Sequence, residues 1–130
     1  MDWRGLALAA AGAAEEGKAS RVMLLDVRSL TLVADYFLIL SAPTRVQVKA
    51  VADRIEERLS RLGARPRHRE GYPAGTWVLL DYGPLVVHAF REEERRFYNL
   101  ERLWGDAPAL DLGGLAAGGG GGGGGGPGTS

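Results

Sequence analysis

Residues 76–90 have the sequence TWVLLDYGPLVVHAF, in which two apolar runs lie on either side of Tyr82-Gly83. Short runs rich in valine and aromatic residues, separated by a glycine turn, are typical of two antiparallel strands. We therefore predict strands over 76–81 and 85–90, joined by a two-residue turn at Tyr82-Gly83. That turn sets the register of the hairpin, because opposite residues are counted outward from it. The predicted opposite pairs are Asp81 with Pro84, Leu79 with Val86, Val78 with Val87, and Trp77 with His88.

Alternate residues of a strand point to opposite faces of a sheet, so this hairpin has two faces of different character. The aliphatic face suits packing under helices and comprises Val78, Leu80, Leu85 and Val87. The mixed face combines apolar area with polar groups and comprises Trp77, Leu79, Val86, His88 and Phe90. If helices cover only one side, the mixed face is partly open, and an open patch with tryptophan is typical of a protein-binding hot spot. The alternative is that the last helix covers it and all five residues are core.

The flanking sequence supplies three helices and two further strands. The clearest helix is marked at both ends, because Thr44 and Gln47 have the spacing of a capping box and Gly63 follows its last residue. Asp2 is the predicted cap of a first helix, and Gly17 suits the left-handed residue that often ends one. The predicted elements are helices over 2–17, 44–62 and 92–104 and strands over 21–26, 35–41, 76–81 and 85–90. This order predicts a single α/β (α+β) domain with one mixed β-sheet flanked by helices.

The composition limits the classes of partner. The chain has 130 residues with 16 basic and 16 acidic side chains, so no net positive charge favours wrapping by nucleic acid or adhesion to a membrane. The sequence contains no cysteine, which excludes disulfides and thiolate metal sites and suits a reducing cytosol. The apolar runs are too short to span a membrane. We expect a cytoplasmic protein with a protein or small-molecule partner.

A change in composition marks the end of the predicted domain. Gly105, Asp106 and Pro108 interrupt the periodic pattern, and nine consecutive glycines follow at Gly118 to Gly126. Glycine has no side chain to bury and loses the most backbone entropy on folding. We predict a folded domain over residues 2–107 and a flexible glycine-rich tail over 108–130.

Several residues outside the hairpin are candidates for either core or contact. Phe97, Leu100 and Trp104 share one face of the last predicted helix and are predicted to be core, whereas Tyr98 points elsewhere and is a contact candidate. Glu70 precedes Gly71 where a strand is expected to end, with a contact role for Glu70 as the alternative.

The remaining charged residues offer two further kinds of site. A basic stretch follows the long helix and comprises Arg58, Arg61, Arg65, Arg67 and Arg69. We predict a solvated surface there, with contact to RNA phosphates as the alternative. His68 and His88 are the only histidines, and no second ligand lies at metal-binding spacing. We predict no metal site and no cofactor.

Five blocks of sequence together resemble the ribosomal silencing factor (Iojap) family, in its order and spacing, across nearly all of the predicted domain. They are Leu25-Asp26-Val27 with 34–41, Gln47 to Asp53, Glu70-Gly71, Trp77 to Gly83 with Val86 to Phe90, and Arg96 to Trp104. Two turns depart from the family pattern. Ala42-Pro43 precedes the long helix where the family usually has a glycine, and Pro84 follows the turn glycine where an aspartate is usual.

The resemblance implies a nucleotidyltransferase-like topology and a translational repressor. Such a protein binds ribosomal protein L-fourteen on the large ribosomal subunit and sterically blocks association with the small subunit. A large-subunit assembly factor is the alternative within the family. A minor contact with ribosomal RNA and a homodimer in the free state are further partner predictions, and no membrane partner is expected. The residues predicted to contact the partner are Glu70, Trp77, Leu79, Asp81, Tyr82, His88, Phe90 and Tyr98.

The competing class is a nucleotidyl-transfer enzyme, because the implied fold is shared with such enzymes. That chemistry needs two carboxylates one residue apart on a strand, so that both reach the metal ions. Asp26, Asp35 and Asp81 lie on different segments and form no such pair. We therefore predict no enzymatic activity and no catalytic residue.

Overall fold

A computed structural model describes residues 1–99, 102, 105 and 107–112, apart from the side chain of Tyr98. It contains one five-stranded sheet in the order β1-β2-β5-β4-β3. The strands are β1 (Ser20–Asp26), β2 (Tyr36–Ala42), β3 (His68–Glu70), β4 (Trp77–Asp81) and β5 (Leu85–Arg91). β2 and β5 pair in parallel and the other neighbours pair antiparallel, so the predicted α+β domain with a mixed sheet is confirmed. β3 is an addition, since the sequence indicated only a strand end at Glu70.

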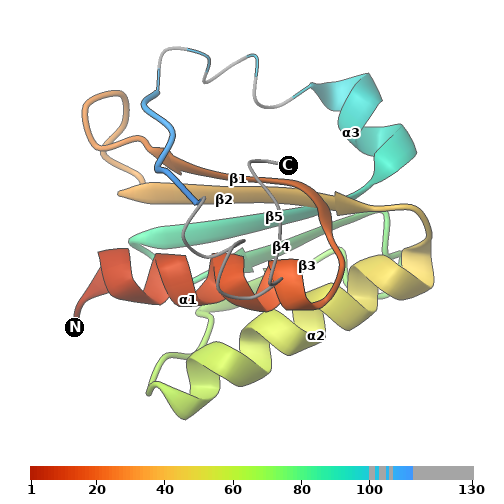
Figure 1. Cartoon of the computed structure of the whole chain (residues 1–130), viewed down its shortest axis with the longest axis horizontal. Coiled ribbons are helices and arrows are strands. Elements are labelled where there is room, and N and C mark those ends of the chain that lie inside the picture. The colour runs from red at the N-terminus through yellow and green to blue at the C-terminus, as the bar shows by residue number, and fades with distance from the viewer. Residues whose placement is uncertain (100–101, 103–104, 106, 113–130) are drawn as a thin grey trace.

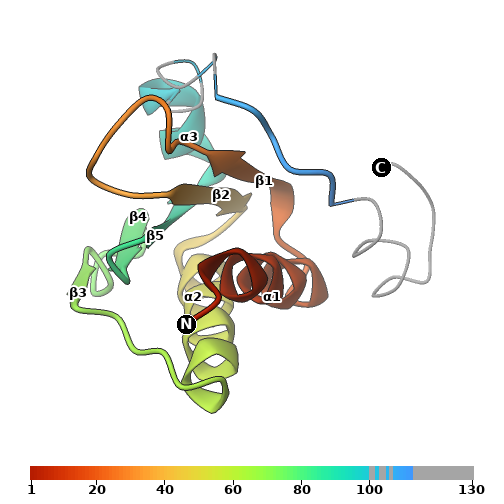
Figure 2. The ribbon, with the colours of Figure 1, turned by 90° about the vertical axis from the view of Figure 1, so that its left-hand side faces the viewer.

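Two helices, α1 (Trp3–Glu16) and α2 (Arg45–Arg61), form a layer against one face of this sheet (Figures 1 and 2). They cover the aliphatic face, as predicted, because Val78, Leu80, Leu85 and Val87 are fully buried in one cluster with helix residues. The buried residues of α1 are small and let the helix approach its neighbours closely: Ala7, Ala10, Ala11, Ala13 and Ala14, beside Leu6. None of the described helices is long and apolar enough to cross a membrane.

The predicted helix caps are largely confirmed. Asp2 Oδ1 accepts a hydrogen bond from Gly5 N at 3.1 Å, and Thr44 Oγ1 accepts one from Gln47 N at 3.2 Å. These bonds satisfy backbone donors that a helix leaves unpaired in its first turn. The expectation for the end of α1 is wrong, because Gly17 has a φ of −79° and the left-handed residue is Lys18, at 67°.

The predicted register of the β4–β5 hairpin is wrong by two residues. Trp77 lies opposite Phe90, Leu79 opposite His88, and Asp81 opposite Val86. Tyr82 N donates to Leu85 O at 2.8 Å, so the two-residue loop consists of Gly83 and Pro84 rather than Tyr82 and Gly83. Proline has no N–H for the ladder, and Gly83 supplies the positive φ, 93°, that such a loop needs. A shift of two keeps every side chain on its predicted face.

The last helix, α3 (Glu92–Tyr98), is shorter than the predicted 92–104, because Asn99 adopts a left-handed φ of 49°. The prediction that Phe97 is core is wrong, since its side chain is 80% exposed. Arg95 is buried instead, at 1% exposure, and its Nη1 donates to Ser41 Oγ at 3.1 Å. The polar groups of Ser20 and Ser41 at this end of the sheet therefore suit an arginine better than a phenyl ring. Leu100 and Trp104 lie outside the described residues.

The described chain ends on a segment that lies along the outer edge of β1. Asp26 N donates to Pro108 O at 2.9 Å, and Leu110 N donates to Leu24 O at 2.8 Å. Leu110 and Leu112 pack against the main core as partly buried residues. The tail predicted from residue 108 therefore starts with residues that are hydrogen-bonded to the domain. Residues from 113 onward lie outside the described residues.

Candidate protein-binding face

The observed register extends the mixed face across all five strands. Side chains that lie opposite one another in a sheet share a face, so the pairs can be followed from β1 to β3. One row runs through Met23, Ile39, His88, Leu79 and Glu70. The neighbouring row runs through Leu25, Phe37, Val86, Asp81 and His68. The mixed face is thus a continuous surface on the side of the sheet opposite α1 and α2.

Exposure rises along these rows from β5 towards the β3 edge. Val86, His88 and Phe90 are at most 7% exposed, so for these three the alternative of a core role holds. Trp77 and Leu79 on β4 are half-buried, and Glu70 and His68 on β3 are exposed. One accessible part of the mixed face therefore lies over β4 and β3, with Trp77 and Leu79 as its large apolar side chains, and Met23 at the β1 edge is half-buried as well.

Trp77 is held in a defined orientation by two neighbours on β5. Its indole Nε1–H donates to His88 Nδ1 at 3.3 Å, and its ring lies 4.8 Å from the ring of Phe90. A tryptophan fixed before binding loses little rotamer entropy when a partner covers it. Trp77 is therefore a pre-oriented and partly accessible aromatic side chain.

His88 is a buried neighbour of Trp77 and is not exposed on the mixed face. It is 6% exposed and meets the edge of Phe37 at 5.1 Å between ring centroids. Burial lowers the pKa of His88 from 6.5 to about 4, so its imidazole is neutral at neutral pH. Because Nδ1 accepts from Trp77, the proton lies on Nε2, which has no hydrogen-bond partner among the described residues. The sequence placed His88 in direct contact, whereas its geometry fits a positioning role.

Gly71 brings Glu70 to the edge of the mixed face. Its φ is 76°, and a Cβ added there would lie 2.1 Å from the carbonyl oxygen of Trp77. Only glycine permits so close an approach of two backbones. The turn after β3 thus holds Glu70 opposite Leu79, where its carboxylate is exposed beside the apolar area.

Asp81 and Tyr82 are less suited to contact than the sequence predicted. Asp81 Oδ1 accepts from Gly83 N at 2.7 Å and so stabilises the turn, although its side chain stays 24% exposed. Tyr82 is 3% exposed and belongs to the cluster under the helices, with its ring 6.2 Å from that of Trp3. Burial raises the pKa of the Tyr82 phenol. The structure therefore separates Tyr82 from the mixed face, while the side chain of Tyr98 lies outside the described residues.

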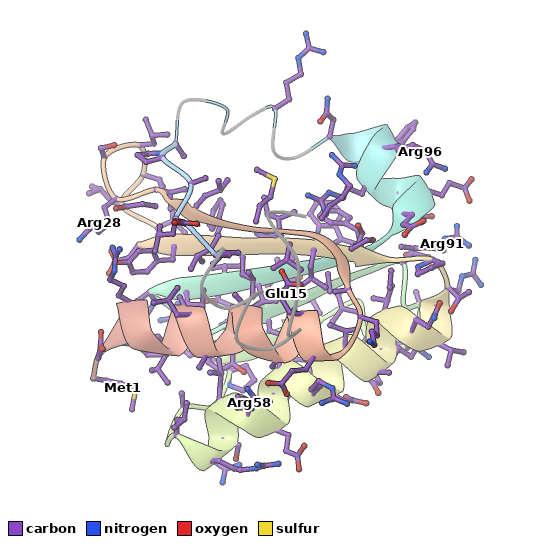
Figure 3. The ribbon with its side chains drawn as sticks, viewed as in Figure 1. Met1, Glu15, Arg28, Arg58, Arg91 and Arg96 are labelled. Atoms are coloured by element: carbon purple, nitrogen blue, oxygen red, sulfur yellow. The ribbon has the colours of Figure 1, made fainter. Side chains whose placement is uncertain are left out.

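Most of the basic stretch is neutralised by acidic neighbours. The pairs are Arg58 with Glu16, Arg61 with Glu57 at 3.1 Å, Arg67 with Asp81 at 3.6 Å, and Arg69 with Asp53 at 3.0 Å and Glu56 at 3.1 Å. Figure 3 shows Arg58 on α2, on the side of the sheet away from α3. Paired arginines attract RNA phosphates less than unpaired ones, which favours the solvated surface over the RNA contact.

The described residues contain no group of three or more histidine, aspartate and glutamate side chains placed to hold a metal ion. Asp26, one of the three aspartates that form no metal-binding pair in the sequence, accepts two hydrogen bonds from Arg28, at 2.9 and 2.6 Å. The hydrogen bond from Arg28 lowers the pKa of the Asp26 carboxyl. This geometry gives the carboxylate a role in the loop after β1.

The family model described as "Ribosomal silencing factor during starvation" matches residues 2–119. The chain belongs to the ribosomal silencing factor family. The ribosomal silencing factor RsfS of Bacillus subtilis is 41% identical over 112 residues, which cover 86% of this chain and 95% of that protein. The chloroplastic protein Iojap of Zea mays is 34% identical over 82% of this chain, but the match spans only 46% of that protein.

Solved structures agree with this family assignment. Protein CV0518 of Chromobacterium violaceum has a TM-score of 0.78 at 31% identity, covering 81% of this chain and 88% of that one. A crystal structure from Bacillus halodurans gives a TM-score of 0.71 at 34% identity, covering 85% and 97% of the two chains. The resemblance to ribosomal silencing factors, inferred from five sequence blocks, is confirmed.

Proposed function

We propose that this protein binds ribosomal protein L-fourteen on the large ribosomal subunit and sterically prevents the small subunit from joining. The part of the mixed face over β4 and β3 is the proposed contact. The outcome is reduced translation, brought about by binding in the cytoplasm without catalysis.

The main support for this contact is the half-buried side chain of Trp77, which is already oriented by its neighbours. Large aromatic side chains at the centre of an interface contribute most of its binding energy, provided that surrounding groups exclude water. Leu79 adds apolar area beside Trp77, and the exposed carboxylate of Glu70 supplies a polar rim. An anchor, apolar area and a polar edge are the parts of a protein-binding surface.

The charge of the protein supports a protein partner within the subunit. The formal net charge is zero, and most arginines of the basic stretch are paired with carboxylates. Ribosomal RNA binding relies on unpaired cations that displace counterions from phosphates. We therefore assign the main contact to protein and only a minor one to RNA.

The test is a subunit-joining experiment with purified subunits and a saturating excess of this protein. We expect fewer joined ribosomes and recovery of the protein with free large subunits. Equal joining with and without the protein contradicts the proposal. The same experiment on subunits stripped of L-fourteen distinguishes the partner, because binding that persists unchanged contradicts the L-fourteen contact.

A role in large-subunit assembly predicts a different result. Cells that lack the protein would then accumulate incomplete large subunits during growth. Under the proposed silencing role, these cells contain normal amounts of mature large subunits and fail only to reduce subunit joining when nutrients are scarce. Sucrose-gradient profiles of growing and starved cells separate the two roles.

A further inference from the structure

The loop between β1 and β2, residues 27–35, presents large apolar side chains to solvent. Leu32 is fully exposed, Val33 is 77% exposed and Leu30 is 44% exposed. Three of the seven large hydrophobic side chains exposed in the described part of the chain belong to this one loop. Single exposed leucines need no explanation, but a group of them in one loop indicates an interaction surface.

The backbone of this loop fixes these side chains in their outward positions. Val27 N donates to Asp35 O at 2.9 Å and closes the two ends, while Leu30 N and Thr31 N both donate to Val27 O at 3.0 Å. Val33 N donates to Thr31 Oγ1 at 3.1 Å, and Asp35 N donates to Pro84 O at 2.8 Å. These bonds hold the backbone in the conformation in which Leu30, Leu32 and Val33 are exposed.

The loop is continuous with the mixed face. Its first and last apolar residues, Val27 and Ala34, are buried in the mixed-face cluster with Leu25, Phe37 and Val86. The tip of the loop, residues 30–33, projects from the same side of the sheet as α3, opposite α1 and α2. It lies at the end of the strands away from α3 (Figures 1 and 2). A partner lying on the mixed face would therefore be next to the tip.

The side chains at the tip suit binding to a protein rather than to RNA. Residues 27–35 include one basic side chain, Arg28, and its guanidinium is already held by Asp26 and lies over the ring of Tyr36 at 5.6 Å. Figure 3 shows Arg28 at the edge of the loop, far from Arg96 on α3. Phosphate binding needs available cations, whereas two leucines and a valine fit an apolar pocket.

We propose that Leu30, Leu32 and Val33 form a second docking surface that inserts into an apolar pocket of the same ribosomal protein that contacts the mixed face. This proposal rests on the proposed function, because that function places a large-subunit protein on the mixed face. It adds a second point of attachment to the contact made by Trp77, Leu79 and Glu70, and so fixes the orientation of the partner.

The chain offers a closely matched control for testing this surface. Val33 in the loop and Val46 in the first turn of α2 are 77% and 76% exposed. An aspartate at either position removes the same apolar area from a solvent-exposed site. We expect Val33→Asp to weaken binding to purified large subunits by about tenfold or more, and Val46→Asp to change it by less than about twofold.

Equal affinities of Val33→Asp and Val46→Asp, with both variants melting like the wild type, overturn the proposal. Trp77→Ala measured alongside separates the two proposals. If it loses binding while Val33→Asp does not, the loop surface is wrong and the proposed function stands. Wild-type protein that fails to bind large subunits at all contradicts the proposed function first.

A photo-crosslinking amino acid at position 32 identifies the occupant of the tip. We expect crosslinks to one large-subunit protein, and the same protein from a crosslinker placed at position 79. Crosslinks from position 32 to ribosomal RNA, or to a second copy of this chain, overturn the proposal. The same placement at Val46 serves as the control and should give no crosslink to that protein.

Discussion

β4 contributes alternate residues to two faces of the sheet that differ in what they contact. Val78 and Leu80 point towards α1 and α2 and are fully buried, whereas Trp77 and Leu79, one residue away on the same strand, are half-buried. The aliphatic face is covered from β1 to β4, while the mixed face becomes more exposed towards β3. Stability and recognition are therefore divided between alternate residues of one strand, and each can be changed separately.

Truncating a residue of the aliphatic face should cost the most stability. Leu80→Ala should lower the free energy of unfolding by about 3 kcal/mol, because it leaves a cavity among fully buried neighbours. Leu79→Ala, the matched change on the mixed face, should cost about 1 kcal/mol, because part of the leucine is already in water. Denaturant unfolding of both variants measures the difference. Equal losses would show that the two faces are buried alike.

His88 should make the stability of the folded protein depend on pH. Its folded-state pKa, about 4, lies below the ordinary value of 6.5, so the unfolded chain binds the proton more readily below pH 6.5. Stability is fully present above pH 6.5 and is lost as the pH falls towards 4, by about 2 kcal/mol between pH 7.5 and pH 5. Urea unfolding at both pH values tests this expectation.

The two histidines of the chain provide the control for that experiment. His88→Gln should remove most of the pH dependence in this range, and His68→Gln, on the exposed β3 strand, should retain it. A wild type equally stable at pH 7.5 and pH 5 would contradict the burial of a neutral His88.

The two edges of the sheet also differ in what covers them, and the expected effect on stability there is smaller. The β1 edge is covered by residues 108–112, whereas the three β3 residues are exposed. Deleting residues 108–130 should lower the free energy of unfolding by about 1 kcal/mol, since it removes backbone hydrogen bonds and the contacts of Leu110 and Leu112. Deleting only 113–130 should leave it unchanged. Identical thermal melts for both truncated proteins would show that the segment along β1 contributes nothing.

The features that could be predicted from the sequence are those that depend on local pattern. Capping at Asp2 and Thr44 and the aliphatic face under the helices follow from side-chain chemistry and from the two periodicities of helix and strand. The predicted faces survived a wrong register, because an error of two residues preserves the alternation. Trp77 and Leu79 could therefore be placed on the correct face without the structure.

The predictions that were wrong concern features that depend on contacts between distant segments. The hairpin loop moved to Gly83-Pro84 because Tyr82 packs under the helices, near Trp3. Arg95 replaced Phe97 on the inner side of α3, since its partners Ser20 and Ser41 are supplied by β1 and β2. Leu30, Leu32 and Val33 are visible in the sequence as three large apolar residues between two predicted strands, but only the structure shows that they are exposed.

In the proposed division of roles, Trp77 serves recognition while its neighbour Val78 serves stability. The direct test measures the free energy of unfolding and the affinity for large subunits on the same purified samples of Trp77→Ala and Val78→Ala. Trp77→Ala should lose about thirtyfold in affinity while staying folded, whereas Val78→Ala should lose about 2 kcal/mol of stability and keep its affinity under conditions where it is folded. A folded Trp77→Ala variant that binds large subunits as tightly as the wild type would contradict a role of Trp77 in recognition.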